Sequence, residues 1–281
     1  MKIGNYSLHG LELGTFGLDG GAMFGIVPKV LWQKENPADE ENRIHMHTRG
    51  LLLKDEKNRR NILIDCGLGD KDDAKFRDRY KIAPYALETE LARHGLHEND
   101  ITDVIATHFH FDHMGGLTKL DSAGKLTARF PNAKVWAQKR NWAHAWKPNE
   151  KDRASYLPEN FSIYESDSRL QLVDGQEEIL PGIYTRVTEG HTVGMQHPFI
   201  SDGTASLLYC ADIIPMSAHV RTAWVMGYDC FPLTTFEEKK KILSEAAEKD
   251  TVIFFEHCPY TPGARVEWSG KDYRIKEKVS L

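Results

Sequence analysis

The spacing of apolar residues predicts strands that are joined first by turns and later by helices. Residues 50–66 contain two apolar runs around a charged turn, which predicts a β-hairpin ending at Asp65. Hairpins followed by alternating strands and helices are typical of sheets covered by helices, an α/β (α+β) fold. Further short runs rich in apolar and β-branched residues predict strands at 103–107, 134–138, 182–190, 205–212 and 251–258.

Helical spacing is clearest in two segments. Leu87 and Leu91 lie one helical turn apart behind a proline that suits a first turn, so we predict a helix over 84–97. A second helix is predicted over 234–250, because a threonine at its start precedes a glutamate by three residues. That pattern is typical of a capping box.

The chain gives no sign of a second domain. No internal repeat or linker-like stretch interrupts it, so we predict a single domain over residues 1–281. Residues 139–180 are rich in Trp, Asn, Glu and Ser and have no clear period. We predict that they form an inserted segment of loops and helix over one end of the domain.

Composition and charge narrow the classes of function. The 281 residues are 41% hydrophobic and 27% charged, with a formal net charge of −5 and no basic stripe for a phosphate backbone. No apolar run is long enough to span a membrane, and the first residues lack the apolar core of a secretory signal. The cysteines fit no disulfide or zinc-finger spacing. We therefore expect a cytoplasmic protein with reduced thiols and with no nucleic-acid or membrane partner, and we leave a homodimer open.

The segment ATHFHFDHMGG, residues 106–116, gathers three histidines and an aspartate directly after an apolar run. His108 and His110 lie two residues apart, so an extended backbone places both on one side, where they can bind one ion. Once the chain curls, Asp112 and His113 can reach a second ion. Imidazole nitrogens and carboxylate oxygens are the ligands expected for zinc and related divalent metals.

Four side chains do not complete two coordination spheres, so the hypothesis requires further ligands at other strand ends. His191 follows a predicted strand and has glycines nearby. Asp212 closes an apolar strand, where an unpaired charge is unfavourable, and His257 ends another strand. Histidine pairs are often hydrogen-bonded core residues, but the full cluster with three matching strand ends favours metal binding.

These residues resemble the metal ligands of the metallo-β-lactamase superfamily, whose H-x-H-x-D-H motif is matched from His108 to His113. The resemblance implies a four-layer αββα sandwich with the metals at one edge, between the two sheets. It also implies two divalent ions, with zinc expected and manganese, cobalt or iron as alternatives. One ion would bind His108, His110 and His191, the other would bind Asp112, His113 and His257, and Asp212 would bridge them.

Stretches outside the metal motif narrow the resemblance. Residues 18–32, 210–220 and 224–239 are similar to quorum-quenching lactonases of the YtnP type, relatives of the N-acyl-homoserine lactonases. An aspartate at position 212, instead of a cysteine ligand, distinguishes the chain from the zinc β-lactamases.

The resemblance implies a dinuclear metal-dependent hydrolase for a small-molecule ester or lactone. A hydroxide between the metals would attack a lactone carbonyl, with ring opening of N-acyl homoserine lactones as a candidate reaction. The alternative is a phosphotriesterase, an arylesterase or a glyoxalase II-like thioesterase at the same site, because the fold alone does not determine the substrate.

Two residues are candidates for proton transfer. Asp112 could orient the hydroxide and relay its proton, or it could serve only as a metal ligand. Several related lactonases carry a tyrosine three residues after the bridging aspartate, where this chain has Pro215. We therefore predict that His219 donates a proton to the leaving alkoxide. A hydrogen bond behind the ligands, or simple exposure to solvent, is the alternative for His219.

Other positions are expected to surround the site. Asp65 is interpreted as an aspartate that orients a ligating histidine and not as a ligand itself. Met23 and Phe24 could contact an acyl chain or could belong to the core.

Overall fold

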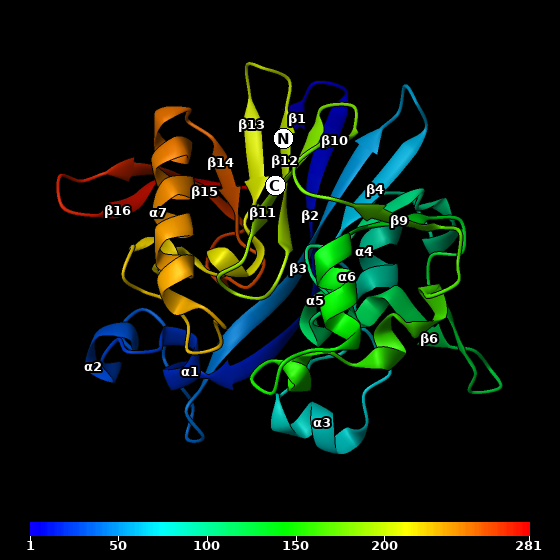
Figure 1. The fold of residues 1–281 in the computed structure, drawn as a ribbon, viewed down its shortest axis with the longest axis horizontal. Helices are drawn as coiled ribbons and strands as arrows, with labels where there is room; N and C mark the ends of the chain where they lie inside the picture. The colour runs from blue at the N-terminus through cyan, green and yellow to red at the C-terminus, as the bar shows by residue number, and fades with distance from the viewer.

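The computed structural model describes all residues from 1 to 281 and contains two large β-sheets (Figure 1). The first sheet comes from the N-terminal part of the chain and the second from the C-terminal part. In hydrogen-bonded order, the first sheet consists of β1 (Lys2–Ile3), β2 (Tyr6–Asp19), β3 (Arg43–Asp55), β4 (Arg60–Ile64), β5 (Asp103–Ile105), β8 (Lys134–Gln138) and β9 (Leu170–Val173). The second consists of β10 (Glu178–Leu180), β11 (Ile183–Thr188), β12 (Met195–Ser201), β13 (Ser206–Tyr209), β14 (Val252–Phe254), β15 (Gly263–Trp268) and β16 (Tyr273–Val279).

The remaining elements are a small hairpin and short helices around the sheets. The hairpin pairs β6 (Thr118–Leu120) with β7 (Leu126–Ala128). The α-helices are α1 (Gly20–Phe24), α2 (Lys29–Trp32), α3 (Ala74–Arg79), α4 (Leu87–Arg93), α5 (Phe111–Met114), α6 (Lys139–Trp146) and α7 (Pro232–Glu248). Single 3₁₀ turns are η1 (Glu98–Asp100), η2 (Gly115–Leu117), η3 (Arg153–Ser155), η4 (Pro158–Asn160), η5 (Ser162–Tyr164), η6 (Ala211–Ile213) and η7 (Ser217–Val220).

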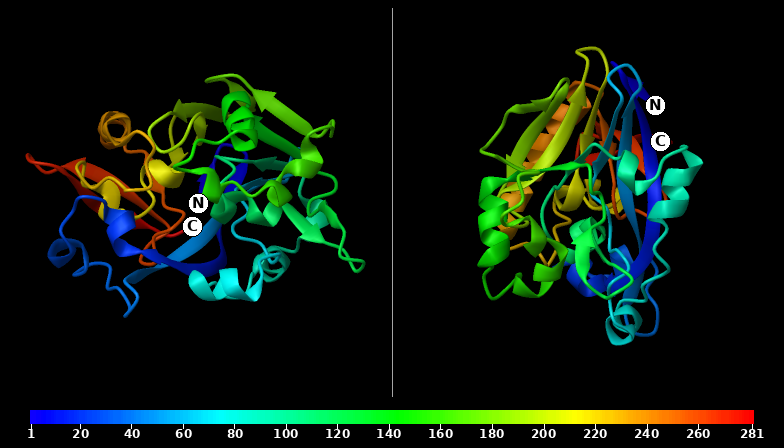
Figure 2. Two further views of the ribbon diagram at one scale, coloured as in Figure 1. Left: turned by 60° about the horizontal axis from the view of Figure 1, so that its bottom comes forward. Right: turned by 90° about the vertical axis from the view of Figure 1, so that its right-hand side faces the viewer.

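The two sheets pack face to face, and each carries helices on its outer side (Figures 1 and 2). α4 contacts β2, and α6 contacts β8 and β9, so both cover the first sheet. α7 contacts β15 and covers the second sheet. The predicted αββα sandwich is therefore confirmed.

The strands of the first sheet are apolar on both faces because both faces are covered. Leu51 and Leu53 of β3 point into the core between the sheets, whereas Leu52 joins a second core with the helices outside. Ile64 and Leu63 of β4 divide in the same way. This is the two-residue alternation of a strand, which a run such as LLL conceals in the sequence.

Several predicted elements agree with the structure. The hairpin at 50–66 is β3 paired with β4, and the strand predicted at 134–138 is β8 with the same bounds. The helix predicted over 84–97 is shorter, because α4 covers only Leu87–Arg93. The predicted segment at 139–180 contains α6 and three 3₁₀ turns, but it also supplies β9 and β10, edge strands of the two sheets.

The predicted capping box at Thr234 or Thr235 is wrong. α7 begins earlier, with Pro232 at its first position, and its N-cap Phe231 makes no side-chain capping bond. Proline fits there because the first helical N–H has no intrahelical partner. The carboxylate of Glu238 instead accepts hydrogen bonds from the backbone N–H groups of residues 189 and 190, at 2.9 and 3.0 Å.

No helix is both long enough and apolar enough to cross a lipid bilayer.

Candidate metal centre

All seven predicted ligands meet at one edge of the sandwich because each follows the end of a strand. β13 and β14 run parallel, so the residues after them, Asp212 and His257, lie at the same edge of the second sheet. β4 and β5 also run parallel, and the histidine motif follows β5. The seven side chains form two adjacent groups of buried ligand atoms.

A close backbone contact fixes the turn after the motif. Gly115 has an ordinary helical φ of −58°, so a left-handed conformation is not the reason for a glycine at this position. A Cβ there would lie 1.9 Å from the carbonyl oxygen of Leu68, so only glycine fits. Asp65 and Ala211, which lie beside the site, do adopt positive φ values of 51° and 42°. Such values are costly for residues other than glycine and cluster at functional sites.

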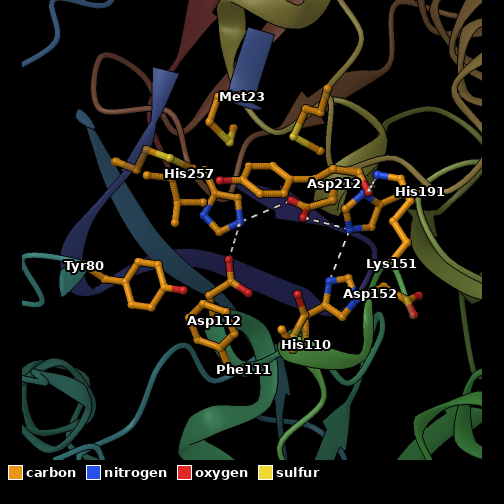
Figure 3. A pocket seen from close by; sticks show the side chains of 16 residues that line it. Met23, Tyr80, His110, Phe111, Asp112, Lys151, Asp152, His191, Asp212 and His257 are labelled. Atoms are coloured by element: carbon orange, nitrogen blue, oxygen red, sulfur yellow. Dashed lines mark hydrogen bonds and ion pairs between the residues drawn. The ribbon is translucent and has the colours of Figure 1, made fainter. Parts of the chain in front are cut away.

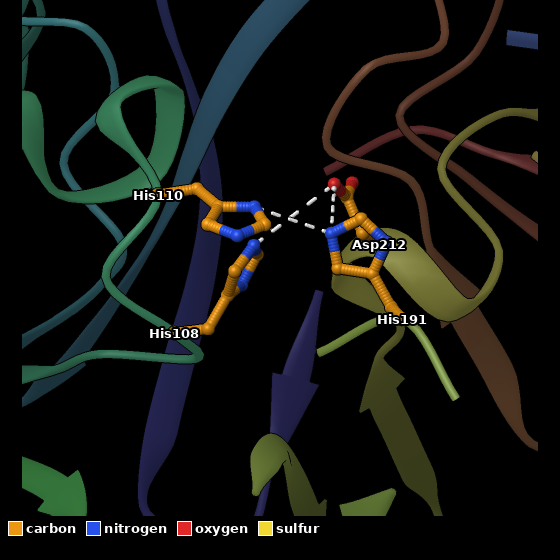
Figure 4. A group of neighbouring side chains, drawn as sticks. All are labelled: His108, His110, His191 and Asp212. Atoms are coloured by element: carbon orange, nitrogen blue, oxygen red, sulfur yellow. Dashed lines mark hydrogen bonds and ion pairs between the residues drawn. The ribbon is translucent and has the colours of Figure 1, made fainter. Parts of the chain in front are cut away.

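The first group, which we call the three-histidine group, consists of His108, His110, His191 and Asp212 (Figure 4). The Nδ1 of His110 lies 3.2 Å from the Nε2 of His191. The Asp212 Oδ2 lies 3.2 Å from the same His191 nitrogen and 4.0 Å from the Nε2 of His108. Three imidazoles and one carboxylate therefore converge on one point.

The second group, which we call the Asp112 group, consists of Asp112, His113 and His257. Figure 3 shows Asp112 and His257 of this group. The Nε2 atoms of its two histidines are 3.2 Å apart, and the Asp112 Oδ2 is 3.7 Å from the Nε2 of His257. Asp212 lies between the two groups, with Oδ1 3.2 Å from His257 and Oδ2 3.2 Å from His191. Its two oxygens thus face different groups.

These donor atoms fit divalent metal ions. In a tetrahedral zinc site with bonds of about 2.0–2.1 Å, neighbouring ligand atoms lie roughly 3.3 Å apart. The inward-facing atoms here are 3.2 to 4.0 Å apart. The buried Nε2 of His108 also has no hydrogen-bond partner in the protein, which is costly unless an ion satisfies it.

Hydrogen bonds behind the histidines turn their lone pairs inward. The Nδ1 of His191 lies 2.8 Å from Asp229 Oδ1, and that of His257 lies 2.8 Å from the His47 carbonyl oxygen. Carboxylate and carbonyl oxygens only accept, so each Nδ1 carries the proton and each Nε2 is free to bind an ion. Sequence reasoning missed Asp229.

His113 is held by two buried carboxylates. Its Nδ1 lies 3.0 Å from Asp65 Oδ2 and 2.9 Å from Glu256 Oε2. Asp65 also accepts from the Thr107 hydroxyl at 2.6 Å, and that hydroxyl lies 3.1 Å from the Nδ1 of His108. Asp65 therefore lies behind ligands of both groups, as its interpretation from the sequence requires. Glu256 was missed.

Charge within the centre is unevenly distributed. Burial and the neighbouring histidines lower the pKa values of His108 and His110 well below the usual range. Burial alone would lower the pKa of His257, but the charges of Asp212 and Glu256 and the hydrogen bond to Asp212 together outweigh it and raise that pKa to about 9. Burial, together with the charge of Asp65, raises the pKa of Glu256 to about 8. The surroundings of Asp212 thus favour a positive charge on His257 and also on His191, whose pKa is raised against burial by Asp212 and Asp229.

A pocket of about 180 Å³ opens onto both groups (Figure 3). Its lining combines apolar side chains, three of them methionines, with polar groups. Met23 lines it, whereas Phe24 is a core residue stacked on His219. The apolar lining consists of Leu18, Met23, Met46, Phe111, Ala154, Met226 and the rings of Tyr80 and Tyr228, and the polar lining includes Lys151, Asp152 and Ser155.

His219 does not line this pocket. It is 1% exposed, and its Nε2 lies 2.9 Å from the carbonyl oxygen of Met23. Burial lowers its pKa to about 3. This geometry favours the alternative in which His219 holds the backbone behind the pocket, and direct proton transfer by His219 stays an untested prediction.

Comparison with known proteins assigns the family. A family model described as the metallo-β-lactamase superfamily matches residues 51–257. The chain belongs to this superfamily. A probable metal-dependent hydrolase from Staphylococcus aureus is 31% identical, with a TM-score of 0.88, and the match covers 99% of this chain and 100% of that one.

Two further proteins similar to this chain are lactonases. N-acyl homoserine lactonase AiiA from Bacillus thuringiensis subsp. kurstaki is 24% identical over 210 residues, which are 70% of this chain and 76% of AiiA. AidC, a dizinc quorum-quenching lactonase solved with a product, has a TM-score of 0.82 at 20% identity. The match covers 100% of this chain and 97% of the AidC chain. These relationships make the protein a metal-dependent hydrolase, and the superfamily implies divalent metal ions.

Proposed function

We propose that the protein is a dinuclear lactonase that opens N-acyl homoserine lactones or similar small lactones. The three-histidine group would hold one ion and the Asp112 group the other, with Asp212 shared and zinc the expected metal. The observation that carries the proposal is that seven ligand side chains converge in two adjacent groups beside a pocket of about 180 Å³ whose lining includes apolar side chains. The lactonases among the relatives support the substrate class.

When bound, a pair of divalent ions lowers the pKa of water towards neutrality and polarises a carbonyl group. The chain contributes orientation to this chemistry. Asp212 faces both groups with separate oxygens 3.2 Å from His191 and His257, which fixes the spacing of the centre. Asp112 lines the pocket, so its carboxylate can orient the attacking hydroxide and hold its proton while the ring opens.

The pocket suits a substrate with one apolar and one polar end. Met23, Met46 and Met226 are flexible and can adapt to acyl chains of different shape. The volume of about 180 Å³ favours a small lactone, because larger ligands occupy clefts of roughly 300 Å³ or more.

A hydrolysis panel on the zinc-reconstituted protein tests the proposal. It should contain N-acyl homoserine lactones of several chain lengths, a simple γ-lactone, paraoxon, 4-nitrophenyl acetate and a glutathione thioester. We expect kcat/KM for at least one lactone to exceed that for paraoxon and the thioester by orders of magnitude. His110→Ala, which removes one proposed ligand, should abolish this turnover.

The opposite ranking would overturn the lactonase assignment. Faster turnover of paraoxon would make the centre a phosphotriesterase, and faster turnover of the thioester would make it a thioesterase. Turnover that survives His110→Ala unchanged would separate the activity from the proposed centre.

A further inference from the structure

Opening a lactone requires an acid as well as a nucleophile. When the bond between the carbonyl carbon and the ring oxygen breaks, its electron pair stays on that oxygen as an alkoxide. An alkoxide is a poor leaving group in water, so a positioned proton donor accelerates the step. The acid must belong to a side chain that reaches the pocket, which His219 does not.

Against the effect of burial, hydrogen bonds from His144 and Thr192 lower the pKa of Asp152 to about 2, so its carboxylate in the pocket has no proton to donate at neutral pH. Besides Asp152 and the proposed ligands, the pocket offers two phenols, an ammonium and a serine hydroxyl. They belong to Tyr80, Tyr228, Lys151 and Ser155. The Lys151 Nζ already donates to the carbonyl oxygens of Gly227 and Tyr228, at 2.6 and 3.2 Å. A serine hydroxyl is a much weaker acid than a phenol. The two tyrosines remain.

Tyr228 lies in a loop whose backbone is fixed on both sides. The N–H of Gly227 donates to the carbonyl oxygen of Ala22 at 2.8 Å. On the other side, Asp229 accepts from the His191 ring at 2.8 Å, and the N–H of Cys230 donates to the His191 carbonyl at 2.9 Å. The loop that carries the phenol is thereby fixed relative to a proposed ligand, and Tyr228 lines the pocket beside it.

The surroundings keep this phenol protonated. Tyr228 is 37% exposed, but desolvation of its hydroxyl is the main cause that raises its pKa above the usual value, and the charges of Asp19 and Asp112 add to it. At neutral pH the hydroxyl therefore carries a proton that it can donate. Tyr80 lies at the far side of the pocket from His191, beside Asp112 and Phe111 (Figure 3), and packs against Phe111 and Phe76.

We propose that Tyr228 is the catalytic acid that protonates the leaving alkoxide, an inference that rests on the proposed lactone hydrolysis. As the carbon–oxygen bond breaks, the proton of the Tyr228 hydroxyl moves to the ring oxygen and forms the alcohol of the hydroxy-acid product. The tyrosinate then recovers a proton from solvent water. The tyrosine expected at position 215 is thus replaced from a different loop.

The test compares leaving groups in Tyr228→Phe. With a lactone, whose leaving group is an alkoxide, kcat should fall by about 100-fold, within the usual range for a lost general acid. With 4-nitrophenyl acetate, whose leaving group is a stable phenolate, it should fall by less than about 3-fold, because that oxygen needs no proton. Tyr80→Phe should change both substrates by a similar factor, and exposed Tyr184→Phe on β11 should match the wild type.

Two measurements distinguish the loss of a proton donor from a structural change in the metal centre. The zinc content of Tyr228→Phe should equal that of the wild type. Its affinity for ring-opened N-hexanoyl-L-homoserine, measured by calorimetry, should be several-fold weaker, because the product alcohol loses a hydrogen-bond partner.

Equal losses on both substrates, or loss of zinc, would mean that Tyr228 only supports the site. A leaving-group effect confined to Tyr80→Phe would transfer the role to Tyr80. If the wild type opens no lactone, the proposed function fails, and an ethyl ester paired with the aryl ester still decides whether Tyr228 protonates alkoxides.

Discussion

The three-histidine group and the Asp112 group present similar ligand atoms but are held in place differently. In the first, His191 has one carboxylate behind it, Asp229, and the Nε2 of His110 has no hydrogen-bond partner. In the second, His113 alone has two carboxylates behind it, Asp65 and Glu256. In the first group a single carboxylate orients His191. In the second, His113 keeps one orienting carboxylate if the other is lost.

Asp65 connects the two groups. It holds His113 directly and His108 through the Thr107 hydroxyl. The two groups therefore differ only in residues that Asp65 does not hold. These are His191 and His110 in the three-histidine group, and Glu256 beside the Asp112 group. Substitutions of these residues should therefore have different effects on metal binding and on stability.

The largest effect is expected where the groups meet. Asp212→Ala removes the only carboxylate that faces both His191 and His257, so the binding of both proposed ions should weaken together. We expect loss of bound metal and a fall in kcat/KM of about 10³-fold or more, since bound metals contribute several kcal/mol. Exposed Asp174→Ala is the control and should behave as the wild type. Retention of full activity by Asp212→Ala would contradict a shared carboxylate.

The second prediction concerns the stability of the metal-free protein. His113→Ala removes the one imidazole that faces both buried carboxylates, Asp65 and Glu256, and leaves them only neutral donors, which should lower the free energy of unfolding by about 3 kcal/mol. His110→Ala orphans no carboxylate and should cost clearly less. Urea denaturation of both variants after chelation measures the difference. Equal losses would show that the two groups are not held differently.

The third prediction compares the supporting carboxylates directly. Asp229→Asn removes the only charge behind His191 and should weaken metal binding by about 10–100-fold. Glu256→Gln should weaken it less, because Asp65 still holds His113 and burial already raises the pKa of Glu256 to about 8. Competition with a chromophoric chelator measures both affinities. A larger effect from Glu256→Gln would reverse the comparison.

The smallest effect is expected one step further from the three-histidine group. Glu238 of α7 accepts from the backbone N–H groups of Glu189 and Gly190, next to His191. Glu238→Gln keeps one acceptor oxygen but loses the charge, so we expect a loss of about 1 kcal/mol in stability. Exposed Glu237→Gln is the matched control. Thermal unfolding of both variants checks the prediction.

The sequence predicted much of the site because the proposed ligands occupy recognisable places. The histidine motif follows an apolar strand, and Asp212 and His257 close two others, so the ends of parallel strands bring them together. The strand pattern predicted sheets covered by helices, and the αββα sandwich was implied by the resemblance that the histidine motif carries. These are local signals whose spatial meaning is fixed by sheet geometry.

The supporting residues lacked such a signal. Asp229 lies in an irregular loop, and only the folded chain brings it within 2.8 Å of His191. Glu256 is a charged residue inside an otherwise apolar run, a feature that could have indicated a buried partner. His219 follows Asp212 closely in the sequence, yet the 3₁₀ turn η7 leaves it behind the pocket with its Nε2 near Met23.

The number of divalent ions per chain tests the central claim most directly. After reconstitution with zinc and removal of free metal by gel filtration, inductively coupled plasma mass spectrometry should give two zinc ions per chain. A value of zero or one under the same conditions would contradict a centre built from both groups.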